Sequence, residues 1–132
     1  MTRFGIDAHV LLRIADGSIT VRTEHQLVAP GSLRSHAQSL LYRSVRDGTI
    51  EREAALAQLE RITEIKVRLL NDRVSRATAW RIAEQLELAD TTLAEFLAVT
   101  KLQADALVTL DPELARLAAG VVGLAEIDAL ER

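Results

Sequence analysis

Three aspartates stand where acidic side chains from distant parts of the chain can meet in one site: Asp7, Asp90 and Asp111. Asp7 ends a short apolar run, Asp111 follows another, and Asp90 opens a segment with helical spacing. Carboxylates that lie close together repel each other unless a cation sits between them. Oxygen ligands suit Mg²⁺ or Mn²⁺, and such an ion can activate water and stabilise a phosphodiester during cleavage. The three aspartates therefore predict metal-dependent phosphodiester chemistry.

Each aspartate also has a purely structural explanation. Asp111 is followed by proline and glutamate, which together make a good helix start. Asp90 can cap a helix, although Thr92 and Glu95 form a competing capping box. Asp7 is different, because a charged residue at the end of a central strand must be paired or bound to something.

Short apolar runs alternate with helical patterns, which favours an α/β fold with a parallel sheet covered by helices. The pattern predicts strands at residues 3–7, 26–29, 65–69 and 106–110, and a possible last strand at 121–126. It predicts helices at residues 9–15, 32–44, 51–63, 74–86 and 90–102, and a short helix starting at residue 111. The strand at 65–69 has the alternation of a half-buried edge strand. Ligands collect at the carboxyl ends of such strands, where Asp7 and Asp111 lie and toward which Asp90 would point.

Composition limits the classes that the chain can belong to. Its 132 residues, 48% of them hydrophobic, suit one domain covering residues 1–132. The absence of cysteine excludes disulfides, thiolate chemistry and cysteine-ligated zinc, and it fits a reducing compartment. No apolar run is long enough to cross a bilayer and no signal peptide opens the chain, so we expect a cytoplasmic protein without membrane contact.

Charge is unevenly distributed along the chain. Residues 34–81 carry ten basic and six acidic residues, whereas residues 82–132 carry three basic and ten acidic residues. Arginines in the basic part could guide an RNA backbone, although ordinary solvated helix faces explain most of them. These are Arg34, Arg43, Arg46, Arg73, Arg76 and Arg81. We expect His9 and His25 at the surface, and Trp80 and Phe96 in the core or a dimer interface.

Four segments, taken in order, resemble those of PIN-domain ribonucleases, and in particular the VapC toxins. The first is Phe-Gly-Ile-Asp ending at Asp7, and the second is Leu-Val-Ala-Pro ending at Pro30. The third, Ala-Asp-Thr-Thr-Leu-Ala, includes Asp90, and the fourth, Leu-Val-Thr-Leu-Asp, ends at Asp111. Together they span nearly the whole chain, and the last segment is the most specific.

The resemblance implies a three-layer α/β/α sandwich with a mainly parallel sheet. It also implies Mg²⁺- or Mn²⁺-dependent cleavage of RNA by a toxin that a cognate antitoxin protein holds, with the toxin as a homodimer. Carried over position by position, Asp7, Asp90 and Asp111 would be the catalytic metal ligands. Thr109 would be the hydroxyl beside the last acid, which it would orient.

The chain departs from the family pattern at His36, where the family has a glutamate. His36 shares a helical face with Leu33, Ala37 and Leu40, so we expect it to point inward and pack or form a hydrogen bond. A neutral imidazole cannot replace a carboxylate's charge, and Mg²⁺ favours oxygen. The resemblance therefore predicts activity that is weak with Mg²⁺ and relatively better with Mn²⁺.

Two alternatives to an active ribonuclease follow from these residues. The first is a catalytically degenerate PIN domain that binds RNA or a protein without cutting. The second is a phosphatase-like or receiver-like α/β domain, which also begins with an aspartate at a strand end. The second alternative is weaker, because Asp7 is not followed by the second aspartate of haloacid-dehalogenase phosphatases. Neither Lys66 nor Lys101 is placed as a receiver domain requires.

Overall fold

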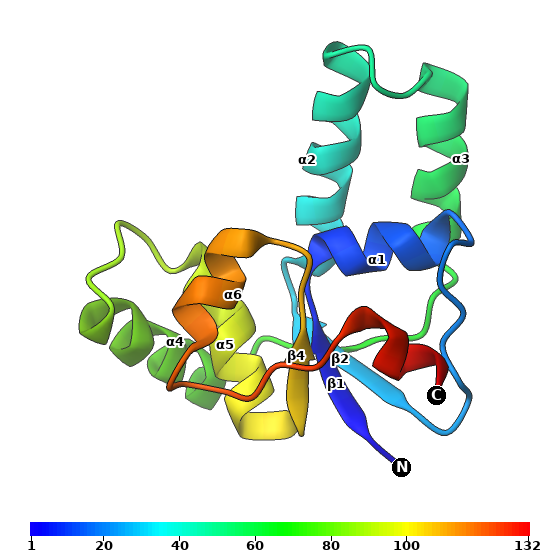
Figure 1. Ribbon diagram of the computed structural model, residues 1–132. Coiled ribbons are helices and arrows are strands. Elements are labelled where there is room, and N and C mark those ends of the chain that lie inside the picture. Colours follow the sequence, from blue (N-terminus) through cyan, green and yellow to red (C-terminus); the bar gives the residue numbers. More distant parts are fainter.

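A sheet of four parallel strands forms the centre of the molecule, in the order β3-β2-β1-β4 (Figure 1). The computed structural model describes all 132 residues. The strands are β1 (Arg3–Ile6), β2 (Gln26–Pro30), β3 (Arg68–Leu70) and β4 (Ala106–Val108). Both the predicted α/β class and the predicted parallel sheet are confirmed, and β3 is an edge strand as its sequence pattern indicates.

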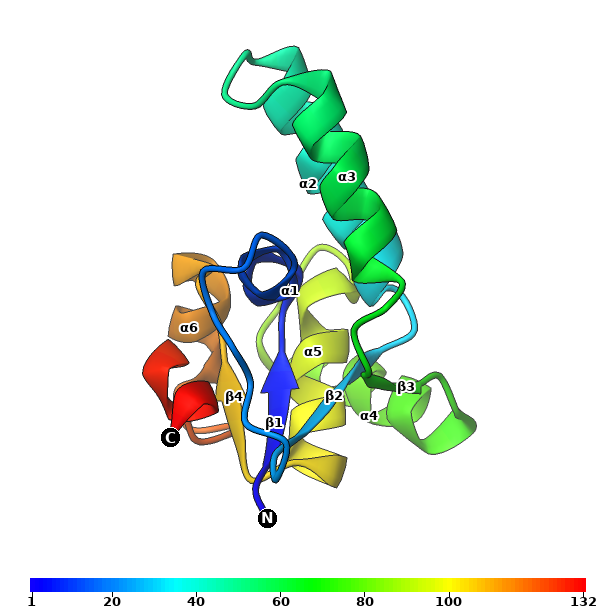
Figure 2. The ribbon, with the colours of Figure 1, turned by 90° about the vertical axis from the view of Figure 1, so that its right-hand side faces the viewer.

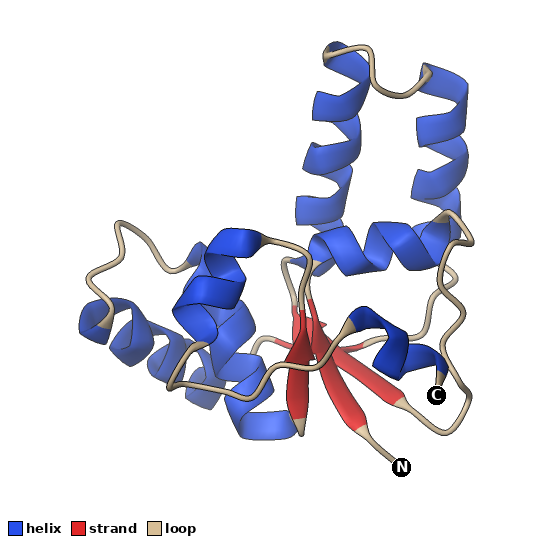
Figure 3. Ribbon diagram, viewed as in Figure 1, coloured by secondary structure: helices blue, strands red, loops and turns tan.

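Six α-helices and one 3₁₀ helix surround the sheet (Figure 3). They are α1 (Ala8–Ala15), α2 (Leu33–Arg46), α3 (Arg52–Ile62), α4 (Arg73–Gln85), α5 (Thr92–Gln103), α6 (Pro112–Ala118) and η1 (Ile127–Glu131). Helix α5 packs against β1 and β2, and α4 packs against α5; in Figure 2, α6 and η1 lie beside β4, and α1 lies above the strands. The arrangement is the predicted three-layer α/β/α sandwich.

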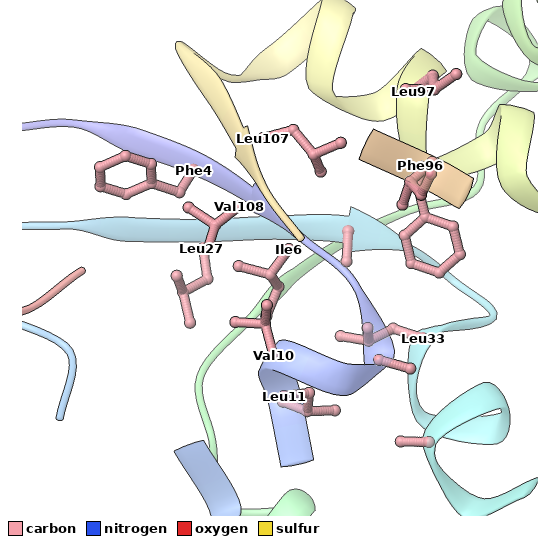
Figure 4. Close-up of a cluster of buried hydrophobic side chains, with 14 of the residues drawn as sticks. Phe4, Ile6, Val10, Leu11, Leu27, Leu33, Phe96, Leu97, Leu107 and Val108 are labelled. Atoms are coloured by element: carbon pink, nitrogen blue, oxygen red, sulfur yellow. The ribbon is translucent and has the colours of Figure 1, made fainter. Parts of the chain in front are cut away.

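Alternation along β1 sends side chains to the two faces of the sheet. Phe4 and Ile6 are buried with Leu27 on the face that receives α1, where Val10 and Leu11 pack (Figure 4). On the opposite face Gly5 leaves room for α5: a β-carbon there would lie 2.1 Å from the Thr100 hydroxyl oxygen. The absence of a side chain at position 5 therefore sets how closely α5 approaches the sheet.

The expected last strand at residues 121–126 is reduced to a single parallel bridge between Leu124 and Leu107. The Leu107 amide donates to the Gly123 carbonyl, and the Ala125 amide donates to the Leu107 carbonyl, both at 2.9 Å. Before this bridge the amides of Val121 and Val122 still bond to the end of α6. The chain consequently reaches β4 only at Gly123 and leaves it again for η1, too briefly to form a strand.

Helices α2 and α3 form a hairpin that projects beyond the sheet (Figures 1 and 2). Two arginines fasten its base: Arg34 donates to the carbonyls of Ile62 and Ile65, and Arg61 donates to the carbonyl of Ala15 at 2.5 Å. Arg34 therefore holds the hairpin together and is not a free cation for RNA.

The sequence led to expectations about the burial of Phe96, Trp80 and His25. Phe96 is buried as expected, whereas Trp80 is 63% exposed on α4 and lies outside the core. His25 is half-buried and packs its ring edge-on against Phe4 at 5.1 Å, with both ring nitrogens buried and without hydrogen bonds. The expected surface position of His25 is therefore wrong, since the loop before β2 folds it onto β1.

None of the helices is both long enough and apolar enough to span a bilayer.

Candidate functional site

The path of the chain through the sheet reverses between β1 and β4. The chain runs outward from β1 to β2 and β3 and then returns to place β4 on the free side of β1. In open parallel sheets a reversal of this kind leaves a crevice at the carboxyl ends of the two strands, where ligands bind. Asp7 directly follows β1, and Thr109 and Asp111 follow β4, so all three residues lie at the carboxyl ends of these two strands.

Asp7 is 2% exposed, and its carboxylate is held by groups from two distant segments. One oxygen accepts a 2.8 Å hydrogen bond from the Val10 amide, so that Asp7 caps the start of α1. The other oxygen accepts from the Thr109 hydroxyl and, at 3.2 Å, from the Leu110 amide. These bonds join the end of β1 to the end of β4 and fix the orientation of the carboxylate.

Thr109 is the link between the two aspartates. Its hydroxyl donates to Asp7 and accepts a 3.0 Å hydrogen bond from the Asp111 amide. Asp111, half-buried, caps α6 by accepting from the Glu113 amide at 3.0 Å, while its second carboxylate oxygen accepts no hydrogen bond. Thr109 thus orients the carboxylate of Asp7, and only the backbone of Asp111.

The donor set of this pair fits a hard divalent cation. A carboxylate offers about four acceptor positions, and the Asp7 carboxylate uses three of them for protein donors. Asp111 keeps one oxygen free of protein donors. Mg²⁺ typically binds to one or two carboxylates and retains several waters, so two oxygen donors of this kind suffice. No three acidic or histidine side chains stand close enough together to hold a metal ion.

Asp90, the third predicted ligand, is not brought to this pair. It lies before α5, is exposed, and accepts a 3.0 Å hydrogen bond from the Thr92 amide. This hydrogen bond holds the pKa of Asp90 below its ordinary value. Asp90 therefore stabilises the entry into α5, which is the structural role open to it from the sequence.

Glu95 is the acidic side chain of α5 that approaches the sheet. It is half-buried in the first turn of α5, and it lines a small hollow with Pro30 and Leu70, the last residues of β2 and β3. Thr91 donates a long, 3.3 Å hydrogen bond to its carboxylate. Glu95 thus lies with its carboxylate near the carboxyl ends of β2 and β3. The sequence signal for Glu95 was its place in a capping box, which suggested only a structural role.

His36 points inward from α2, as its helical face predicts. Its ring centroid lies 6.0 Å from that of Phe96 on α5, with the ring planes tilted by 53°. The Nδ1 atom is buried and has no hydrogen-bond partner. His36 therefore packs between α2 and α5, and no acidic side chain takes up its imidazole.

Comparison with known proteins supports the fold and no more. No protein-family model matches the chain, and no curated protein matches it. Among solved structures, the chain is similar to PAE2754 from Pyrobaculum aerophilum, with a TM-score of 0.71 and 22% sequence identity. The likeness covers 98% of this chain and 93% of that one, so the entire α/β/α architecture is shared.

Proposed function

We propose that the protein is a metal-dependent endoribonuclease of the PIN-domain, VapC-like type, which acts in the cytoplasm and is held by an antitoxin protein. The observation that carries the proposal is the hydrogen-bonded junction of Asp7, Thr109 and Asp111 at the carboxyl ends of β1 and β4. RNA as the substrate rests on the resemblance of the strand-end motifs around these residues.

Asp7 and Asp111 would hold Mg²⁺ or Mn²⁺. When bound, the cation supplies an activated water and neutralises charge on the phosphodiester. The protein's own contribution is to fix the ligands. Thr109 and the Leu110 amide keep the Asp7 carboxylate in one orientation, and burial of Asp7 excludes competing water from it.

A catalytically degenerate PIN domain is the second candidate, and two observations favour it. Three protein donors already occupy the Asp7 carboxylate, and His36 supplies no negative charge where the family has a glutamate. A domain of this kind would retain the crevice and bind RNA or protein without cutting.

A cleavage assay on total RNA separates the two candidates. The purified protein is incubated with Mg²⁺, with Mn²⁺ and with a chelator, and the RNA is resolved by denaturing electrophoresis. The proposed ribonuclease cuts in Mn²⁺ and stops on chelation. RNA that remains intact in both metals, with a folded protein, supports the degenerate module.

The two acids near the start of α5 make a matched pair of variants. We expect Glu95→Gln to lower the cleavage rate about 10- to 100-fold, because it removes a charged oxygen donor from the carboxyl edge of the sheet. Asp90→Asn should leave the rate within about twofold, because asparagine caps a helix nearly as well as aspartate. Initial cleavage rates at a fixed Mn²⁺ concentration measure both. A larger loss of cleavage rate in Asp90→Asn than in Glu95→Gln would instead indicate that Asp90 belongs to the site.

Restoring an acid at position 36 should change the metal preference. His36→Glu places a carboxylate on the inward face of α2, so we expect Mg²⁺-dependent cleavage to rise relative to Mn²⁺-dependent cleavage. The ratio of the two rates, measured on wild type and variant in parallel, is the readout, with His36→Gln as an uncharged control. A wild type that is already fully active in Mg²⁺ and indifferent to the substitution would contradict this expectation.

A further inference from the structure

The projecting hairpin carries an open groove between its two helices. The groove has a volume of about 860 Å³. Its lining residues include Ser35, Tyr42, Arg43 and Arg46 of α2 and Arg52 and Leu56 of α3. We call it the arm groove. Its floor is apolar, and its charged lining residues are all arginines.

The arginines of the arm groove have no bonded partner within the chain. Arg43, Arg46 and Arg52 form neither ion pairs nor hydrogen bonds within the chain, whose ion pairs involve other arginines. The acidic residues nearest along the chain are Asp47 and Glu51 in the loop at the tip and Glu53 in the first turn of α3, and none of the three lines the groove. Three guanidinium groups around one concave surface concentrate positive potential there, which favours an anionic occupant.

An exposed aromatic ring lies among these charges. Tyr42 is 67% exposed, and Leu56 beside it in the groove is 43% exposed. Guanidinium groups pair with phosphate through two parallel hydrogen bonds, and an exposed tyrosine ring provides a face on which an unpaired base can stack. Cations, an aromatic ring and an apolar floor in one groove are the elements of a single-strand binding surface.

The arm groove leads back to the candidate site. Helix α2 begins at Leu33, shortly after β2 ends at Pro30 on the carboxyl edge of the sheet. The groove starts at Ser35, and Arg46 lies about 16 Å further along the helix axis at 1.5 Å per residue. The arm groove therefore begins near the same edge of the sheet on which Asp7 and Asp111 lie.

We propose that the arm groove binds single-stranded RNA, with Arg43, Arg46 and Arg52 on its phosphates and Tyr42 against one base. The inference rests on the proposed function for the choice of RNA, and it adds the surface that holds the strand outside the metal site. An acidic polypeptide is the competing occupant, since it would satisfy the same three cations.

Binding is measured by fluorescence anisotropy of a labelled single-stranded RNA in the presence of EDTA, which prevents cleavage. We expect the triple variant Arg43→Gln, Arg46→Gln, Arg52→Gln to weaken binding at least about tenfold. Loss of three phosphate contacts should also flatten the slope of log affinity against log salt by about 2, at about 0.7 per contact. Tyr42→Ala should cost about tenfold, and Tyr42→Phe should restore most of it. Arg3→Gln, at an exposed arginine that opens β1, is the matched control and should leave binding unchanged.

Circular dichroism melts confirm that the exposed substitutions leave the variants folded. Unchanged affinity and salt slope in the triple variant would overturn the arm groove as an RNA surface. In a competition experiment, polyglutamate and an unlabelled RNA are each added to the complex with labelled RNA. Weaker displacement of the labelled RNA by polyglutamate than by unlabelled RNA supports the proposal, whereas stronger displacement by polyglutamate overturns it. Cleavage by the wild type is measured separately. RNA binding at the groove without cleavage contradicts only the proposed ribonuclease function. Cleavage that the triple substitution leaves unchanged contradicts only the proposed role of the groove.

Discussion

Replacing Asp7 with asparagine is expected to lower RNA cleavage by at least about 100-fold in either metal, because the variant removes the more buried charge of the proposed cation site. The measurement is the initial cleavage rate of a labelled RNA in Mg²⁺ and in Mn²⁺. Addition of more metal should recover little of the loss, since the asparagine lacks the negative charge that holds a divalent ion.

Asp7→Asn also disturbs the fold, which a second variant controls for. The asparagine NH₂ group would face the Thr109 hydroxyl or the amide of Val10 or Leu110, and an unsatisfied donor there costs about 1–3 kcal/mol. Asp111→Asn avoids this cost, because Asp111 is less buried and asparagine also caps a helix. Both variants should lose cleavage, while only Asp7→Asn should melt at a lower temperature. Full activity in a folded Asp111→Asn protein would be incompatible with the proposed pair of ligands.

The largest expected effect on stability comes from Gly5→Ala. The added β-carbon would lie 2.1 Å from the Thr100 hydroxyl oxygen and 3.1 Å from the Thr100 β-carbon. Thr100 is buried, and its hydroxyl bonds to the Phe96 carbonyl, so it cannot swing aside freely. Helix α5 must then move away from β1, and overpacking of this kind costs about 1–3 kcal/mol or more. Urea unfolding followed by circular dichroism measures the loss in free energy of unfolding.

Two further variants test the reason for that loss. Gly123→Ala is the matched control, since a β-carbon there meets nothing within 4 Å, and it should change stability by less than about 0.5 kcal/mol. Combining Gly5→Ala with Thr100→Ala removes the hydroxyl from the collision, so the double variant should recover part of the loss. Equal costs for Gly5→Ala and Gly123→Ala would show that contact with α5 is not the cause.

Sequence periodicity was sufficient for most of the fold. Apolar residues repeat in a way that separates helices from buried strands, and the predicted helices agree with α1 to α5 within about two residues. Residues 121–126 show where such a pattern fails. Their composition suits a strand, but turns that continue from α6 through Val122 leave only Gly123 to Ala125 in reach of β4. The length of a turn depends on tertiary contacts, which composition does not report.

The sequence predicts the positions of site residues that follow strands. It does not predict the direction of side chains that depend on the rotation of a helix. Asp7 and Asp111 follow strands whose carboxyl ends must share an edge, so their proximity follows from the parallel sheet. Asp90 and Glu95 both stand near the start of α5, and which one faces the sheet depends on where the helix begins. The helix begins at Thr92, two residues after the position expected from the sequence, and each residue turns the helix by about 100°. Asp90 is thereby left outside the helix, and Glu95 is turned toward β2 and β3.

The arm groove could not be predicted from the sequence, for a different reason. The apolar spacing of α2 and α3 predicts that the two helices pack, but not how far they diverge. The arginines on α2 were visible as a basic stretch, yet only the structure separates Arg34, bound to backbone carbonyls, from Arg43 and Arg46, which are free. Arginine thus has a structural role at the base of the hairpin, whereas the arginines near its tip are available to bind a ligand.

The most direct test of the central claim is a Mn²⁺ titration followed by electron paramagnetic resonance, in which the signal of free Mn²⁺ falls as the ion binds. We expect wild-type protein to remove Mn²⁺ from solution at one site, and Asp111→Asn protein, folded to the same extent, not to do so. Binding of equal strength in wild type and Asp111→Asn, or no binding by the wild type up to millimolar Mn²⁺, would contradict a cation site between β1 and β4.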